Sequence, residues 1–271
     1  MKKVSYSAFL LLLIPSIVGC ISVPISKAEL IAGKASFTKE YIKSGNFTLL
    51  TLQRFNKNSD TLRVYIEGDG RAWASKYQLS DDPTPANPVA LKLAAVDLSD
   101  DIAYIARPGQ YSPSGLPNCN SKYWSDARFA PEVVESIDKI ISKLKERSGA
   151  KYVELVGYSG GGAIAVLVTA RRRDVKVLRT VAGDLNTDLF CTLHHVSPMI
   201  SSLNPLDVAQ QIKMNPQRHF VGSMDTIVPR SIVGSFVKME GDTDDKRITV
   251  VDGVSHNQGW EKHWRELLLM N

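Results

Sequence analysis

The chain of 271 residues contains only three cysteines, and the CxxC and HxxxH spacings typical of zinc sites are absent. A strong excess of charge is absent as well, because 33 basic residues face 28 acidic ones and are spread along the whole sequence. These absences argue against a metal centre and against a nucleic-acid partner. Low-complexity segments, internal repeats and a dividing linker are also missing, so a single globular domain is expected over residues 28–271.

A hydrophobic run long enough to cross a bilayer is missing too. The apolar stretch over residues 8–18 follows the charged start Met1-Lys2-Lys3 and is interrupted by Pro15. It falls short of the roughly 20 apolar residues that a membrane-spanning helix needs. A basic start followed by a short apolar run is typical of a secretory signal peptide, which is removed from the mature protein.

The end of this stretch carries a more specific pattern. Ile17-Val18-Gly19-Cys20 resembles the lipobox of bacterial lipoproteins, in which the cysteine becomes the first mature residue and carries lipid. The resemblance implies a signal peptide over residues 1–19, a lipidated tether over residues 20–27 and a membrane anchor at Cys20. Ile21 in place of Asp resembles the outer-membrane sorting pattern, which implies a protein of the bacterial cell envelope that faces the periplasm. An ordinary cleavable signal with a cysteine near the cut is the alternative.

The remainder of the chain alternates between strand-like and helical segments. A helix over 28–35 precedes two strands, 37–42 and 47–55, and Ser44-Gly45-Asn46 has the turn residues that join such strands as an antiparallel hairpin. From residue 62 onward the alternation indicates an α/β fold with a mainly parallel central sheet and helices on both faces. Strands of this sheet are expected at 62–66, 102–105, 152–156, 175–181, 219–222 and 248–251.

Two long stretches, 71–88 and 107–130, do not fit the alternation and are rich in Pro, Gly, Ser and Asp. Both follow predicted strands. Because loops after the carboxyl ends of parallel strands surround the ligand crevice of an open α/β sheet, we expect these two stretches to form the walls of a pocket.

Gly157-Tyr158-Ser159-Gly160-Gly161 matches the GxSxG pattern and lies between a predicted strand and a helix predicted over 160–170. A serine on so sharp a turn needs small neighbours, because bulky side chains would collide with the adjoining strand and helix. The turn lifts the hydroxyl clear of the sheet and directs the amide of Gly160 toward a developing oxyanion. The pattern indicates Ser159 as a nucleophile, and a glycine-rich turn that binds an anion without a nucleophile is the alternative.

With this motif the sequence resembles the α/β-hydrolase superfamily and its esterase- and lipase-like serine hydrolases, over essentially all of residues 28–271. The resemblance implies the α/β-hydrolase fold, with an acid and a histidine following the nucleophile. Asp225 takes the acid position, 66 residues after Ser159, and His256 takes the histidine position 31 residues later. Asp184, which follows the preceding strand, is the alternative acid. The other four histidines fit less well, namely His194, His195, His219 and His263.

The second oxyanion donor is expected in the loop after strand 62–66, which reads Glu67-Gly68-Asp69-Gly70. This loop resembles the His-Gly-type oxyanion motif of the family with Glu in place of His, and the resemblance puts the donating amide at Asp69. Two carboxylates beside an oxyanion would oppose its charge unless they point away or are paired, for which Arg71 and Arg107 are candidates. A simple tight turn is the alternative.

Two cysteines are left once Cys20 is assigned to lipid. In an oxidising compartment Cys119 and Cys191 are expected to form a disulfide that would hold the second long loop over the pocket. Such a bond requires their Cα atoms to lie within about 7 Å of each other.

The sequence therefore predicts hydrolysis of an ester or thioester through a covalent acyl-enzyme, without a metal or an organic cofactor. The substrate is expected to be a small-molecule or lipid-like acyl compound. Two alternatives stay open, a lipid-anchored scaffold protein without turnover and an acyltransferase with the same three residues. The acyl preference and the oligomeric state are not predicted.

Overall fold

The computed structural model describes residues 1, 23–75, 77–112, 119–242 and 244–270. Cys20, together with the predicted signal peptide, lies outside these residues, so the anchor stays a prediction. Among the helices that these residues form, none has the length and hydrophobicity needed to span a bilayer. The predicted helix at 28–35 begins earlier, as α1 (Val23–Lys34), and so takes up part of the segment assigned to the tether.

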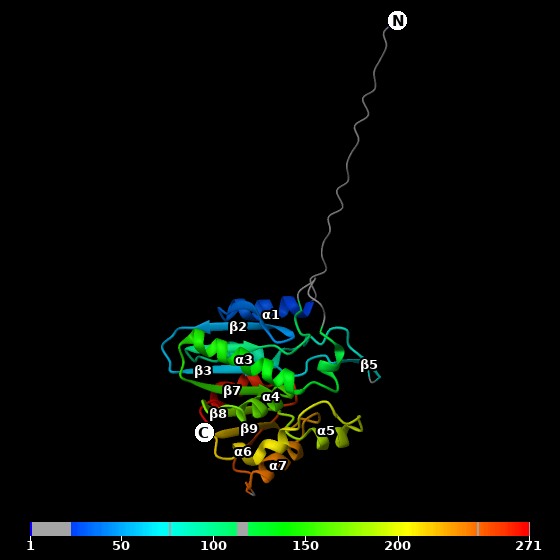
Figure 1. The fold of residues 1–271 in the computed structure, drawn as a ribbon, viewed down its shortest axis with the longest axis vertical. Helices are drawn as coiled ribbons and strands as arrows, with labels where there is room; N and C mark the ends of the chain where they lie inside the picture. The colour runs from blue at the N-terminus through cyan, green and yellow to red at the C-terminus, as the bar shows by residue number, and fades with distance from the viewer. Residues whose placement is uncertain (2–22, 76, 113–118, 243, 271) are drawn as a thin grey trace.

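An eight-stranded sheet forms the centre of the molecule in the order β1-β2-β6-β3-β7-β8-β9-β10 (Figure 1). The predicted hairpin is present, since β1 pairs antiparallel with β2 through a turn between Ser44 and Phe47. Strand β2 is also antiparallel to β6, and from β6 to β10 all neighbouring strands are parallel. The strand bounds are β1 (Thr38–Ser44), β2 (Phe47–Phe55), β3 (Thr61–Ile66), β6 (Asp101–Ile105), β7 (Tyr152–Tyr158), β8 (Val175–Val181), β9 (Gln217–Gly222) and β10 (Ile248–Val251).

Successive side chains of the parallel strands point to opposite faces of the sheet, so both faces are apolar. Helices cover both of them. Val64 and Leu155 belong to the apolar cluster on one face, whereas Tyr65 and Val156 belong to the cluster on the other. The first cluster contains residues of α3 (Pro131–Ser148), α4 (Gly160–Thr169) and α7 (Arg230–Met239), and the second contains residues of α1, α2 (Val89–Val96) and α8 (Trp260–Leu267).

The two long stretches that interrupt the alternation are folded against each other. The first contains a small hairpin of β4 (Trp73–Ser75) and β5 (Gln78–Leu79), and the second contains the 3-10 helix η1 (Ser121–Trp124). The indole N–H of Trp124 donates to the carbonyl of Ser80 at 3.0 Å. Gly109, at φ +83°, lies so close to the Trp124 ring that a Cβ atom there would be 2.6 Å from it. The remaining short helices are α5 (Thr187–His194), η2 (Pro205–Val208) and α6 (Ala209–Ile212).

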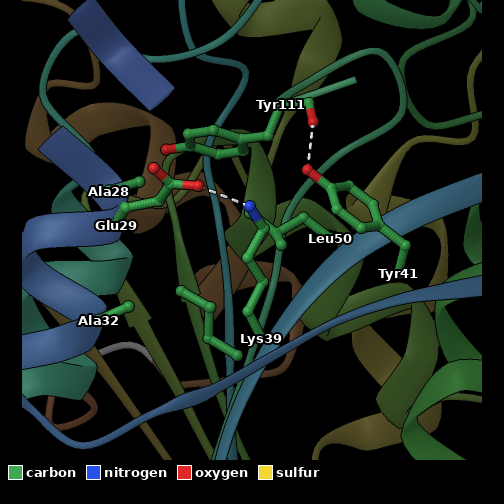
Figure 2. Close-up of a pocket in the computed structure, with 8 residues that line it drawn as sticks. Ala28, Glu29, Ala32, Lys39, Tyr41, Leu50 and Tyr111 are labelled. Carbon is green, nitrogen blue, oxygen red and sulfur yellow. Dashed lines mark hydrogen bonds and ion pairs between the residues drawn. The ribbon is translucent and has the colours of Figure 1, made fainter. Parts of the chain in front are cut away.

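The N-terminal elements are attached to the second long loop as well. A small cavity of about 20 Å³ lies between α1, β1 and β2. Figure 2 shows the residues that line it. Beside it Lys39 pairs with Glu29 at 2.6 Å, and the Tyr41 hydroxyl donates to the backbone carbonyl of Tyr111 at 2.8 Å. The latter bond fixes the start of the second long loop to the edge of the sheet.

The predicted disulfide is wrong, because Cys119 and Cys191 are free thiols. Cys191 is buried in the larger apolar cluster, and Cys119 packs against the same cluster. Burial raises the pKa of Cys119 to about 11 and also raises that of Cys191, so both thiols act here as small apolar side chains. The prediction relied on compartment and cysteine count, neither of which contains the geometry that a disulfide requires.

Candidate active site

Ser159 occupies a strained turn between β7 and α4. Its backbone angles are φ 51° and ψ −123°, a conformation that non-glycine residues rarely adopt. The carbonyl of Ser159 accepts from the amides of Gly162 at 2.8 Å and Asp184 at 3.1 Å, and its own amide donates to Val181. These bonds from three directions hold the serine in place despite the strain.

The glycines of the motif are required by close backbone approach. A Cβ atom at Gly157 would lie 2.2 Å from the carbonyl oxygen of Gly161, and one at Gly161 would lie 2.3 Å from that of Ile66. No flexible side chain stands at either position to move aside. The GxSxG pattern is therefore explained by the contact between the turn, its own helix and the neighbouring strand β3.

Ser159, His256 and Asp225 form a hydrogen-bonded chain. The His256 Nε2 atom lies 3.1 Å from the Ser159 hydroxyl, and Nδ1 lies 2.9 Å from Asp225 Oδ2. The Asp225 side chain is fully buried, and its other oxygen accepts from the amides of Ile227 and Val228 at 2.8 Å each. Because Asp225 can only accept when ionised, Nδ1 donates to it, which leaves Nε2 free to accept the serine proton.

Two side chains that the sequence did not single out hold the loop that carries His256. The Tyr158 hydroxyl and the Trp260 indole N–H both donate to the carbonyl of His256, at 3.1 and 2.9 Å. Tyr158 directly precedes the serine, so the two loops of the site are fixed to each other. Tyr158 occupies a position that the GxSxG pattern leaves unspecified, and Trp260 is the first residue of the last helix. Neither position indicates a role in the site from sequence alone.

Asp184, the alternative acid, is placed differently. It follows β8, and its backbone amide donates to Ser159, while the structure gives Asp225 and not Asp184 as the carboxylate that bonds to His256. Burial, and then the nearby Asp69 charge, raise the pKa of Asp184 to about 7. Asp184 is thus a buried carboxyl beside the serine without a part in the hydrogen-bonded chain.

The loop after β3 runs against the serine on the side where an oxyanion would form. A Cβ atom at Gly160 would lie 2.1 Å from the Asp69 Oδ1 atom. The Asp69 carboxylate is paired with Arg128 at 2.8 Å and with Arg107 at 3.3 Å. Of the two predicted partners, Arg107 is therefore confirmed, and Arg128 stands where Arg71 was expected. Burial lowers the pKa of Arg107 to about 10, so its guanidinium stays charged at neutral pH.

Glu67, in the place of the family's histidine, serves the neighbouring helix. It is buried and accepts hydrogen bonds from the backbone amides of Ala90 and Leu91 in the first turn of α2, and from the Tyr104 hydroxyl. The N-cap of α2 is Pro88, which provides no side-chain cap, so Glu67 supplies it from outside the helix. Burial raises the pKa of Glu67 to about 7, against the lowering effect of these bonds. Glu67 thus joins the loop after β3 to α2.

A cleft of about 490 Å³ opens onto Ser159 and His256. The first long stretch forms a large part of its wall, as predicted, whereas the second contributes Arg128 as its one lining residue. Other parts of the chain complete the lining with Asp184, Phe190, Ile227 and Asn257. Few large apolar side chains line it, and charged ones are frequent. The apolar ones are Trp73, Phe190 and Ile227, and the charged ones are Glu67, Asp69, Arg71, Arg128 and Asp184.

His219 lies outside this cleft. It is buried in β9 with its Nδ1 2.9 Å from the Thr180 hydroxyl, and burial lowers its pKa to about 3, which keeps the ring neutral. His194 bonds instead to the carbonyl of Ile227. Neither reaches Ser159, in agreement with the choice of His256.

No protein-family model and no curated protein matches this sequence. Solved structures do resemble its fold. An esterase from Pyrococcus furiosus has 14% identity and a TM-score of 0.62, covering 94% of each chain. Est1E from Butyrivibrio proteoclasticus has 14% identity and a TM-score of 0.60, over 85% of this chain and 97% of that one. An α/β serine hydrolase homologue from Coxiella burnetii has 16% identity and a TM-score of 0.56, over 85% and 93%. The predicted α/β-hydrolase fold is thereby confirmed.

Proposed function

We propose that this protein is a serine hydrolase that cleaves an ester or thioester through a covalent acyl-enzyme. The observation that carries the proposal is the hydrogen-bonded chain from Ser159 through His256 to Asp225, built on a strained turn at the mouth of a cleft. The similarity of its fold to that of the esterase named above supports the proposal.

In the first half-reaction Ser159 Oγ attacks the acyl carbon while its proton moves to His256 Nε2. The bond from the acyl carbon to the leaving oxygen or sulfur then breaks, and His256 returns the proton to that leaving group. In the second half a water molecule gives a proton to His256 and attacks the acyl-enzyme. The acid leaves, and Ser159 recovers its proton. Asp225 stabilises the imidazolium in both halves.

Charge that develops on the carbonyl oxygen falls beside Gly160 and Asp69, whose amides we propose as the oxyanion donors. The Asp69 carboxylate would oppose such a charge if it were free. Its pairing with Arg107 and Arg128 leaves this part of the site with a net positive charge, which favours an oxyanion.

Reaction with a fluorophosphonate probe tests the proposal, because the probe forms a stable bond only with an activated serine. We expect labelling of the folded protein, loss of labelling in Ser159→Ala, and retained labelling in Ser231→Ala, which changes an exposed serine on α7. A folded wild-type protein that resists the probe would refute the hydrolase proposal. Product analysis with added alcohol then separates hydrolysis from acyl transfer, since both begin with the same acyl-enzyme.

We further propose that Cys20 carries lipid, that residues 1–19 are removed, and that the domain is anchored in the bacterial cell envelope, on the periplasmic side of the outer membrane. The ammonium group of Lys27, in α1, donates to the carbonyl of Ala86 at 3.0 Å, and Ala86 lines the cleft. A lipid attached seven residues before Lys27 (27 − 20 = 7) would therefore hold the cleft near the membrane. Cys20→Ser should move the protein from the membrane fraction to the soluble fraction, and persistence in membranes would contradict the anchor.

A further inference from the structure

Two hydrogen-bond acceptors in the cleft have no donor. Among the described residues, Asp184 Oδ1 and Asn87 Oδ1 are shielded from solvent and without a hydrogen-bond partner, although both residues line the cleft. Asp184 as a whole is only 3% exposed. The other acids of the cleft are different, because Asp69 is paired with two arginines and Glu67 accepts from backbone amides. Buried polar groups in proteins are nearly always satisfied, so an exception in a cleft points to a ligand.

The backbone places Asp184 beside the atom that would carry the acyl group. Ala182, two residues earlier, has a φ of 49°, and a Cβ atom at Gly162 in α4 would lie 2.8 Å from the Cα of Gly183. The Asp184 amide then bonds to the carbonyl of Ser159. These contacts hold the backbone of residue 184 against Ser159, and both residues line the cleft.

Arg128 is the cation that acts on the Asp184 carboxyl, but it does not form an ion pair with it. Arg128 lowers the pKa of Asp184 through its charge, but the guanidinium bonds to Asp69 at 2.8 Å, and the Asp69 carboxylate acts in the opposite direction. A donor from the substrate would satisfy the free oxygen that the protein leaves open. A plain alkyl chain would leave it buried and unpaired, which disfavours such a substrate.

The second acceptor supports the same substrate chemistry. The Asn87 side-chain NH₂ donates to the carbonyl of Asn257 at 2.6 Å, which fixes the orientation of the amide and leaves Oδ1 as the free atom. Asn257 directly follows His256, and Asn87 lines the same cleft as Asp184. The Asn87 carbonyl oxygen and the ionised Asp184 carboxylate are both acceptors, so both pair with donors of a ligand.

We propose that Asp184 selects acyl groups that carry a hydroxyl or an amino group close to the scissile carbonyl, and that it accepts a hydrogen bond from that group. The inference rests on the proposed hydrolase function and adds the class of substrate. Polar hydroxyacyl or aminoacyl esters are then preferred over unsubstituted fatty acyl esters.

The test compares p-nitrophenyl butyrate with its 2- and 3-hydroxy and 2- and 3-amino derivatives as substrates of the wild-type protein. At least one derivative should be hydrolysed with a kcat/KM roughly tenfold to a hundredfold above butyrate, after correction for its spontaneous hydrolysis. Asp184→Ala should abolish that preference. Asp184→Asn, which keeps an acceptor but loses the charge, should retain part of a preference for hydroxyl and lose one for ammonium.

Asp188→Asn is the matched control, because it removes a carboxylate from the exposed surface of α5 outside the cleft. It should keep the ratio between substituted and plain ester. Equal rates for all five esters, or a preference that survives Asp184→Ala, would overturn the role of Asp184 while leaving the hydrolase proposal intact. A protein that hydrolyses none of the esters and resists the fluorophosphonate would overturn both. The ratio cancels any general effect of a substitution on folding or on Ser159.

Discussion

Charged side chains gather at both ends of the parallel strands, and the pKa values of their carboxyl groups shift in opposite directions at the two ends. At the end away from the cleft, Arg63 pairs with Asp97 at 2.8 Å and with Glu154 at 2.7 Å, and Arg179 also pairs with Glu154. Tyr65 adds a hydrogen bond to Asp97 at 2.6 Å. Burial alone would raise the pKa of Asp97, but the Arg63 charge and these bonds lower it overall.

At the cleft end, by contrast, burial dominates and raises the pKa of Glu67 and of Asp184 to about 7. Around Arg63 each carboxylate is paired with an arginine of the protein itself, Asp97 with Arg63 and Glu154 with both Arg63 and Arg179. A site leaves groups incomplete because a ligand or a reaction intermediate completes them. The comparison predicts that changes at the cleft end affect activity, whereas changes at the Arg63 end affect stability.

The largest effect is expected from Asp225→Asn. The amides of Ile227 and Val228 would hold the Asn carbonyl oxygen, which turns its NH₂ toward His256 Nδ1. Nδ1 must then accept, so Nε2 carries the proton and cannot take one from Ser159. We expect kcat to fall about 10⁴-fold with little change in the unfolding midpoint. Activity within tenfold of the wild type would show that another group serves as the acid.

At the opposite end, Arg63→Met should act on stability instead. Removal of the guanidinium leaves the buried Asp97 without its ion-pair partner and the partly buried Glu154 with Arg179 alone, and the free energy of unfolding should drop by about 3 kcal/mol. Urea unfolding measures the drop. The kcat of the fraction that stays folded should match the wild type, and a selective loss of kcat would break the contrast between the two ends.

Gly160→Ala comes next, because its Cβ atom would collide with the Asp69 carboxylate and displace the oxyanion loop. We expect kcat to fall about 10²–10³-fold, the size seen when one oxyanion donor is lost. Gly234→Ala in α7 is the control, since no atom lies within 4 Å of the added Cβ there. That variant should gain about 0.5–1 kcal/mol of stability and keep its kcat. Equal kcat values in the two variants would show that the contact between residue 160 and Asp69 does not affect catalysis.

The smallest effect concerns pH and stability. Glu67 titrates near its ordinary value of 4.5 when unfolded and at about 7 when folded, so between these values the folded protein binds more protons. Its contribution to the free energy of unfolding therefore decreases as the pH rises through this window, by on the order of 3 kcal/mol. Glu67→Gln should flatten the decrease relative to the wild type in urea titrations at pH 4.5 and 7.5. An unchanged pH dependence would mean that Glu67 is ionised throughout.

The elements of the sheet and the three residues of the hydrogen-bonded chain follow from local patterns. The run 152–156 that predicts β7 stops at Gly157, one residue before the observed strand ends. Ser159, Asp225 and His256 each come after a strand, which brings them to the same edge of a parallel sheet. The ranges predicted for β2, β8 and β10 coincide with those observed.

The partners of these residues were harder to predict because they depend on how loops far apart in the chain fold together. Arg128 reaches Asp69 across 59 positions, and Glu67 caps a helix that begins 22 residues later (89 − 67 = 22). No spacing rule connects such pairs. The same reason explains the wrong disulfide, since the positions of Cys119 and Cys191 are set by a long loop and by α5, whose relation the sequence does not specify.

The bond between Trp124 and Ser80 makes two loops that are 44 residues apart behave as one wall. An insertion in either loop would change the shape of both. Variation of substrate range in proteins of this architecture should then proceed by exchange of the two loops as a pair, and chimaeras that replace only one of them should lose the fit that Gly109 and the indole ring provide. Because Trp124 joins the two loops, we expect them to change together in evolution.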